Sequence, residues 1–442
     1  MSIERWTKWG CAAAFLLLLS AYFQREYQLF REIPAASSTV PGDFAVYYIA
    51  SLQAAGQGDG TLYYPATTDQ DAAQQTLMAA VPSPSSWDNL AQSRGLKRPM
   101  RYIYPPFFAL LMSPLAHWPP HTAFFLWREI SLFLLFVSVL LTLLWLRAEP
   151  LVPLFFVAAV AALSFFPVVE ALYEGQVDVL VLFLWVGGLY CLHQEQPLGS
   201  AICFALGTAV KISPVVVVPL LLLRRQWRWF AAYVATLGFL LGWSIWRLGW
   251  QSHVTYVTQV FPSLSAGAPG LLGKSLATVI HNVYLGHVPM GSEAWHTNVA
   301  LTVVKKLVGG LVYAGVLSYF WERTKTASYL TEELAIMALV VLLISPLSWR
   351  HHFVLAQLPL LYLWIRTRDS EQTSAREWLA LTSITVVMGT PVADYLALMV
   401  HNRLLQIAFA SLLPIAASAA LFLALSKVPR PTQKEMPSAS DA

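Results

Sequence analysis

Long apolar segments recur along this chain and are separated by short polar connections. A helix that crosses a membrane needs about 20 apolar residues, and a helix satisfies all of its backbone hydrogen bonds in lipid. We therefore expect an all-α polytopic membrane protein of about 10–13 transmembrane helices. The candidate spans lie at 9–24, 121–146, 151–169, 177–193, 229–248, 300–321, 333–347, 352–366, 377–398 and 404–425.

The composition supports a lipid environment. Apolar residues make up 57% of the chain and charged residues only 12%, against about 25% charged in a soluble domain. The net charge of +4 is small and spread over many loops, whereas nucleic-acid binding needs a concentrated basic face. We expect membrane lipids, and no nucleic acid, as partners.

Basic residues in the connections predict the orientation, because cytoplasmic loops are enriched in Lys and Arg. The segment 198–223 is ambiguous, since Lys211 and Pro214 interrupt it. If it forms a hairpin of two half-spans, nearly every short basic loop and both termini are cytoplasmic. A single kinked span is the alternative, and it requires 105–118 to cross as well. With this hairpin, two large loops at about 25–120 and 249–299 face outward. We expect one membrane domain over 1–426 and a disordered tail over 427–442.

The first outer loop opens with GDFAVYYIASLQAAG, in which Asp43 precedes an amphipathic pattern. On a helix, Phe44, Tyr47, Tyr48 and Leu52 lie on one side, so this helix is predicted to lie in the membrane interface. Asp43 has two interpretations. It caps the helix N-terminus, or it is a carboxylate held at the membrane surface as a general base.

The same loop ends with MRYIYPPFFALLMSPLAHWPP. Each proline restricts the residue before it, so Tyr104-Pro105-Pro106 predicts an extended entry. The apolar piece 107–115 is too short to span. We expect a second interfacial or re-entrant helix there.

Carboxylates flank the next connection, EALYEGQVD, which contains Glu174, Gly175, Gln176 and Asp178. Carboxylates beside a membrane span are unfavourable unless they face water or a partner. One interpretation is a solvated turn with Gly175 as the helix C-cap. The other is a polar site, because Gln176 and Asp178 begin the following span.

Lys211 lies in the middle of a long apolar segment, GTAVKISPVV. A lysine in this position must extend to the interface, pair with a carboxylate or bind an anion. Pro214 breaks the helix beside it, and free backbone N–H groups at a helix start attract anions.

The segment ISPLSWRHH places Trp349, Arg350, His351 and His352 at the outer end of two spans. Adjacent histidines on a helix point about 100° apart, and no third ligand at zinc spacing is visible. Arg350 with one histidine is more typical of a phosphate or sugar contact; a structural interfacial cluster is the alternative. We expect no metal or other cofactor.

These segments occur in a characteristic order: GDFAVYY, YPPFFALLMSPL, EGQVDVLVL, AVKISPVVVVPLLLLRRQWR and SPLSWRHH. The set resembles the membrane-embedded GT-C glycosyltransferases, most closely the polyprenol-phosphate-mannose-dependent α-mannosyltransferases that elongate phosphatidylinositol mannosides. That family includes decaprenyl-phosphate arabinofuranosyltransferases. The resemblance covers residues from about 10 to 425, and Asp178 departs from it because a neutral residue is usual there.

The resemblance implies inverting transfer of a hexose, mannose first, from a polyprenyl-phosphate donor to a lipid or glycan acceptor. The site would face the non-cytoplasmic side of the plasma membrane. Asp43 would be the general base. The implied donor-phosphate contacts are Lys211, Arg350, His351 and His352. The implied sugar or acceptor contacts are Tyr47, Tyr104, Glu174, Gln176 and Trp349. The alternative function is a secondary transporter or lipid flippase, with Lys211, Glu174 and Asp178 as a relay inside the membrane.

Overall fold

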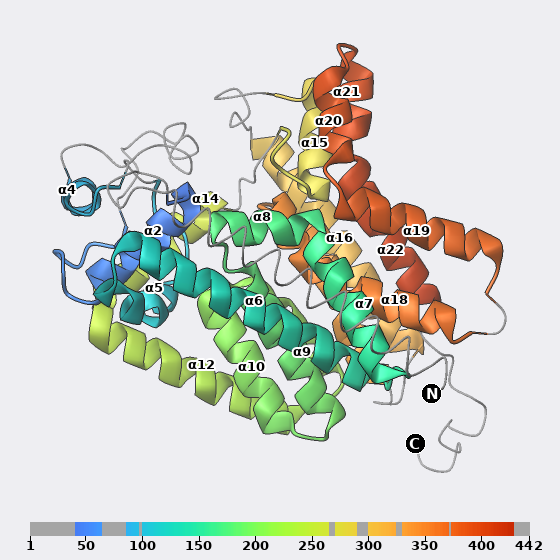
Figure 1. Ribbon diagram of the computed structural model, residues 1–442, viewed down its shortest axis with the longest axis horizontal. Helices are drawn as coiled ribbons and strands as arrows, with labels where there is room; N and C mark the ends of the chain where they lie inside the picture. The colour runs from blue at the N-terminus through green and yellow to red at the C-terminus, as the bar shows by residue number, and fades with distance from the viewer. Residues whose placement is uncertain are drawn as a thin grey trace, which may run out of the picture. The chain divides into compact units, whose positions relative to one another are not determined.

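The computed structural model confirms the all-α prediction (Figure 1). It describes residues 40–63, 85–96, 100–264, 270–289, 299–323, 329–370 and 373–427. Among these residues 81% are helical and none lies in a strand. The predicted first span at 9–24 lies outside the described residues, and so does the predicted disordered tail except for Lys427, which ends the last helix.

The chain divides into two compact units. The first comprises Met1–Phe183, Ala209–Lys211 and Gly238–Leu264, and the second comprises Leu184–Thr208, Ile212–Leu237 and Ser265–Ala442. The predicted single enzyme domain over 1–426 stays a prediction.

The first unit is built around a short buried helix. Its elements are α2 (Gly42–Ala54), α4 (Ser86–Ser93), α5 (Pro106–Met112), a 3-10 helix (Ser113–His117), α6 (Pro120–Trp145), α7 (Leu151–Ser164), α8 (Phe166–Glu174), the start of α9 (Asp178–His193), the end of α12 (Trp227–Leu248), α13 (Trp250–Thr255), a π-helix (Tyr256–Val260) and α14 (Phe261–Leu264). Helix α2 packs against α5, the 3-10 helix and α6 (Figure 1).

The amphipathic pattern predicted one exposed side for α2, and this part of the prediction is wrong; the location of the helix at the membrane interface stays a prediction. Every residue from Phe44 to Ala54 is buried, on all sides of the helix. Helix α5 packs on the predicted apolar side, where Phe108 contacts Tyr47. The 3-10 helix, α4, α6 and α8 also contact α2, so the helix is enclosed by several elements of the first unit.

The second unit surrounds α17. Its elements are the rest of α9, α10 (Pro197–Val210, whose last two residues belong to the first unit), a 3-10 helix (Ser213–Val217), α11 (Val218–Leu223), the start of α12, α15 (Leu276–Leu285), α16 (Val299–Arg323), α17 (Leu330–Ile344), a 3-10 helix (Arg350–Ala356), α18 (Gln357–Arg368), α19 (Ala375–Gly389), α20 (Val392–Met399), α21 (Arg403–Ala410) and α22 (Leu412–Lys427). Helix α17 is buried at Leu330 and from Glu332 to Leu343, and it contacts α16, α18 and α22.

Three predicted spans are interrupted where the sequence analysis expected continuous helices. The bends are 65° between α7 and α8, 69° between α19 and α20, and 43° between α21 and α22. A proline lies at or just after each bend: Pro167, Pro391 and Pro414. A proline lacks a backbone N–H, and its ring clashes with the carbonyl four residues earlier, so the helix breaks.

The described residues contain three helices long and apolar enough to cross a membrane, or up to six if each bent pair is one span. Five shorter apolar elements of 10–17 residues accompany them. The chain is thus a multi-pass membrane protein, and the exact number of crossings stays a prediction. The predicted break at Lys211 is confirmed, because α10 ends at Val210 and a 3-10 helix begins at Ser213.

Candidate active site

Asp43 does not cap helix α2. The N-cap is Pro41, which has no side-chain hydrogen bond, and Asp43 lies in the first turn. Its half-buried carboxylate instead accepts a hydrogen bond at Oδ2 from Nε2 of Gln176, at 2.5 Å. The capping interpretation is therefore wrong, and the contact joins the start of α2 to the turn between α8 and α9.

Gln176 is buried, with only 2% of its surface exposed. Its Oε1 lies 2.6 Å from the Tyr47 hydroxyl and 3.3 Å from that of Tyr104, and the two hydroxyls are 2.8 Å apart. An amide N–H donates and an amide oxygen accepts. The carboxamide can serve both sides only with its nitrogen toward Asp43 and its oxygen toward the tyrosines.

A glycine turn fixes the backbone of Gln176. Gly175 ends α8 in the left-handed conformation at φ 67°, which confirms the predicted C-cap, but the turn is buried, so the prediction of a solvated turn is wrong. The Gln176 N–H donates to Ala171 O at 2.7 Å, and Trp127 Nε1–H donates to Gly175 O at 2.8 Å. A Cβ at Gly175 would lie 2.9 Å from Cβ of Phe44. The turn therefore packs directly beside Asp43.

The surroundings of Asp43 raise its pKa, which suits a general base. Burial raises the pKa of this carboxyl above its ordinary value of 3.8, the Gln176 hydrogen bond lowers it, Asp178 raises it and Lys211 lowers it. The net direction is upward. A carboxylate with a raised pKa accepts a proton more readily, which general-base catalysis requires.

Lys211 pairs with a carboxylate of its own unit. Its Nζ lies 2.7 Å from Oδ1 of Asp178, whose side chain is 1% exposed. The ammonium also lies 5.9 Å from the Tyr104 ring centroid, within the range of a cation–π contact. Lys211 was predicted to extend to the interface, to pair with a carboxylate or to bind an anion, and in the structure it pairs with a carboxylate. Glu174, at the end of α8, is partly exposed.

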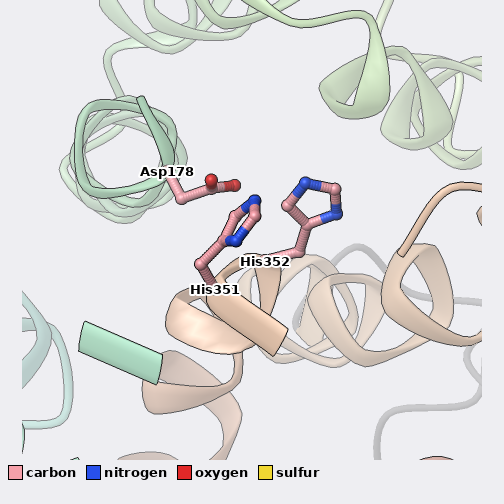
Figure 2. A group of neighbouring side chains, drawn as sticks. All are labelled: Asp178, His351 and His352. Atoms are coloured by element: carbon pink, nitrogen blue, oxygen red, sulfur yellow. The ribbon is translucent and has the colours of Figure 1, made fainter. Parts of the chain in front are cut away.

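In the second unit, the predicted cluster starts a 3-10 helix. The Trp349 N–H donates to Nδ1 of His352 at 3.2 Å, so this nitrogen is the acceptor and a neutral ring carries its proton on Nε2. The rings of His351 and His352 are nearly perpendicular, with centroids 4.6 Å apart. Figure 2 shows both imidazoles rising from this helix; Asp178 in the same view belongs to the first unit.

Arg350 is held by residues that the sequence analysis missed. Its guanidinium pairs with Oδ2 of Asp394 on α20. Nζ of Lys274, which is 2% exposed, lies 2.5 Å from the other oxygen, Oδ1. The Lys274 N–H donates to Ser348 O at 2.6 Å. A lone Asp in the apolar segment VADYLALM was the available signal, because such a carboxylate needs a cation.

The comparisons with known proteins agree with this architecture. The family model described as Glycosyltransferase family 87 matches residues 102–346. A polyprenol-phosphate-mannose-dependent alpha-(1-2)-phosphatidylinositol mannoside mannosyltransferase of Mycobacterium tuberculosis (strain ATCC 25618 / H37Rv) is 26% identical over 318 residues, 67% of this chain and 69% of the relative.

These matches confirm the predicted resemblance and support an enzyme over a transporter. The family match includes Gln176 and Lys211, whereas Asp43 precedes it and Arg350 follows it. It extends over more than half of the sequence, from the first outer loop through α17. The chain belongs to glycosyltransferase family 87.

Proposed function

We propose that this membrane glycosyltransferase transfers a mannosyl residue from a polyprenyl-phosphate donor to a hydroxyl group of a lipid or glycan acceptor, with inversion at the anomeric carbon. The observation that carries the proposal is the Asp43 carboxylate, held at one oxygen by a neutral amide. The name of the mycobacterial relative supports the donor and the sugar.

The reaction needs one base. The acceptor oxygen attacks the anomeric carbon while its proton passes to Asp43, and the bond from that carbon to the phosphate oxygen breaks. The phosphate leaves with the bonding electron pair and stays attached to its lipid. A single displacement inverts the configuration and uses one carboxylate, as in the base half of an inverting hydrolase.

The leaving phosphate gains negative charge and requires cations or hydrogen-bond donors. We propose Lys211, Arg350, His351 and His352 for this role. Two of them are already paired with carboxylates, Lys211 with Asp178 and Arg350 with Asp394. Bidentate geometry makes arginine the stronger phosphate partner, and lysine acts as a point charge.

The proposed sugar and acceptor contacts differ in accessibility. Glu174, Trp349 and Tyr104 are partly exposed, so each can meet a ligand. Tyr47 and Gln176 are buried and hydrogen-bonded to one another. We therefore assign direct sugar contacts first to Glu174, Trp349 and Tyr104.

The test is sugar transfer by the purified protein in detergent, from synthetic polyprenyl-phosphate mannose to a lipid extract. We expect labelled glycolipid whose anomeric configuration is opposite to that of the donor. Polyprenyl-phosphate arabinofuranose and polyprenyl-phosphate glucose are the comparison donors. A higher rate of transfer from either comparison donor than from polyprenyl-phosphate mannose contradicts mannose as the transferred sugar. Retention of the anomeric configuration contradicts a single displacement.

The non-cytoplasmic placement of the site rests on the basic loops. Single cysteines at the exposed positions Asp59 and Leu272 should react with an impermeant maleimide in intact cells, and one at Gln226 should not. The reverse pattern means that the orientation is inverted.

A further inference from the structure

We propose that Gln176 is the positioning residue of this enzyme: one N–H of its carboxamide aims the Asp43 carboxylate, and the hydroxyls of Tyr47 and Tyr104 fix the carboxamide for this purpose. The inference rests on the proposed function, because it assigns Asp43 the role of base. Gln176 would then act through Asp43, without contact to the sugar.

The donors and acceptors of this network fit in one arrangement. The Tyr47 hydroxyl has one proton and lies closest to Oε1 of Gln176, at 2.6 Å. The Tyr104 hydroxyl lies near the same oxygen, at 3.3 Å, and near the Tyr47 hydroxyl, at 2.8 Å. A reversed carboxamide would place its oxygen against the Asp43 carboxylate, which can only accept, so the carboxylate excludes that orientation. The tyrosine hydroxyls, which donate to Oε1, hold the carboxamide in the orientation that donates to Asp43.

The hydrogen bond leaves half of the carboxylate for chemistry. Gln176 donates to Oδ2, and an acceptor hydroxyl can approach Oδ1. A neutral donor orients the carboxylate without neutralising its charge, whereas a lysine or arginine would weaken it as a base. Because Gln176 is buried, its donation to Asp43 does not compete with bulk water.

The competing explanation is structural: Gln176 merely ties α2 to the turn after α8. Neighbouring tyrosines of α2 separate the two explanations. Tyr47 and Tyr48 are both fully buried, and each donates one hydroxyl hydrogen bond. Tyr47 donates to Gln176, and Tyr48 donates to the backbone oxygen of Trp118 at 2.7 Å. Removal of the Tyr48 hydroxyl removes its bond to Trp118, whereas removal of the Tyr47 hydroxyl removes its bond to Gln176 and its 2.8 Å contact with the Tyr104 hydroxyl. Of these two hydroxyls, that of Tyr47 supports Gln176.

The experiment measures kcat, donor KM and the pH dependence of transfer for Gln176→Leu, Tyr47→Phe and Tyr48→Phe. Transfer requires ionised Asp43, so the rate falls as the pH drops through its pKa. The part of the pH–rate profile in which the rate falls toward low pH is its acid limb. A hydrogen bond to the ionised form lowers the pKa of Asp43, so the loss of this bond moves the acid limb to higher pH. We expect Gln176→Leu to shift the limb upward by about one pH unit and to lower kcat about 10–100-fold, with donor KM unchanged.

Tyr47→Phe should shift the acid limb in the same direction by a smaller amount, because Tyr104 still holds the carboxamide. Tyr48→Phe should lose thermal stability without any shift. The proposal is overturned if Gln176→Leu lowers the rate equally at every pH, or if the two tyrosine variants have the same pH profile. Either outcome would mean that Gln176 only connects α2 to the turn after α8.

Asp43→Asn in the same assay separates this proposal from the function on which it rests. If Asp43→Asn is inactive while Gln176→Leu shows no shift, the base stands and only the positioning role fails. If Asp43→Asn transfers sugar normally, the assignment of Asp43 as the base fails. An unchanged pH profile of Gln176→Leu would then follow from the failure of the proposed function.

Discussion

The two units differ in the partners that they give to Asp43 and to Asp394. In the first unit, Asp43 receives a hydrogen bond from the neutral amide of Gln176, and its charge is not cancelled by that partner. In the second unit, Asp394 lies between Lys274 and Arg350. A carboxylate paired with cations has its charge compensated, whereas one held by a neutral amide keeps a negative charge that can accept a proton. The difference separates a reacting group from an architectural one.

A second pair in the first unit sharpens the comparison. Asp178 is buried and is neutralised by Lys211 at 2.7 Å. It lies two residues after Gln176, yet its charge is balanced, so we do not expect it to take the acceptor's proton. Of the two aspartates in this network, Asp43 is therefore the better base.

The largest expected effect tests Asp43 itself. Asp43→Asn keeps the hydrogen bond from Gln176 but removes basicity, so transfer should fall about 10²–10⁴-fold. Burial raises the folded-state pKa of Asp43 above its unfolded value. The ionised form therefore destabilises the fold as pH rises through that interval, and the neutral variant should melt at the same or a higher temperature near pH 7. Transfer assays and thermal melts in detergent measure both.

An Asn variant that retains more than about a tenth of the wild-type rate removes Asp43 from the mechanism. The base would then be sought at His351 or His352, since an unperturbed imidazole titrates at about 6.5.

Lys274→Met should have the opposite profile. It leaves Asp394 with one cation fewer in a buried site, and the loss of one partner from a buried pair costs about 3–5 kcal/mol. We expect a large drop in the melting temperature, with kcat of the remaining folded protein little changed. Lys427→Met is the matched control, because its pair with Glu377, at 3.1 Å, is more exposed and such pairs contribute about 0–1 kcal/mol. Equal melting temperatures of the two variants would contradict the architectural role.

The positions of the helices could be predicted from the sequence, because apolar length is a local property. The positions at which these helices are interrupted were harder to predict. A proline in an apolar segment either kinks or ends a helix, and the outcome depends on packing. The segments around Pro167 and Pro391 were expected to continue, and both are bent. The break at Lys211 was predicted because a lysine and a proline coincide there.

The site could be predicted as a set of residue types, but its pairings could not. Asp43 and Gln176 are separated by 133 positions, and Lys274 and Asp394 by 120. Nothing local connects such residues, so hydrogen bonds and ion pairs between them appear only in the fold. Lys274 stands in a Gly/Pro-rich loop, where a lysine is expected to be solvated.

Lys211 is the residue for which the two roles compete. Lys211→Ala should reduce donor use, because the phosphate loses a charge-assisted bond of about 1.5–3 kcal/mol, and it also leaves Asp178 unpaired. The double variant Lys211→Ala, Asp178→Asn separates the effects. If Lys211 only neutralises Asp178, the double variant recovers the wild-type rate; if Lys211 binds phosphate, donor KM stays high. Single-turnover assays over a range of donor concentrations measure this.

The smallest expected effect concerns the turn that carries Gln176. Gly175 has φ 67°, and a left-handed residue with a Cβ costs about 1–2 kcal/mol. In Gly175→Ala the new Cβ would also lie 2.9 Å from Cβ of Phe44, so the turn must move away from the start of α2. A shift of this kind lengthens the hydrogen bond from Gln176 to Asp43. We expect a modest loss of thermal stability together with an upward shift of the acid limb, smaller than that of Gln176→Leu. Gly286→Ala is the control, because Gly286 also ends a helix at positive φ, 69°, but a Cβ there meets nothing within 4 Å. If both variants lose stability and neither moves the acid limb, the turn supports the fold of the first unit without tuning its carboxylate.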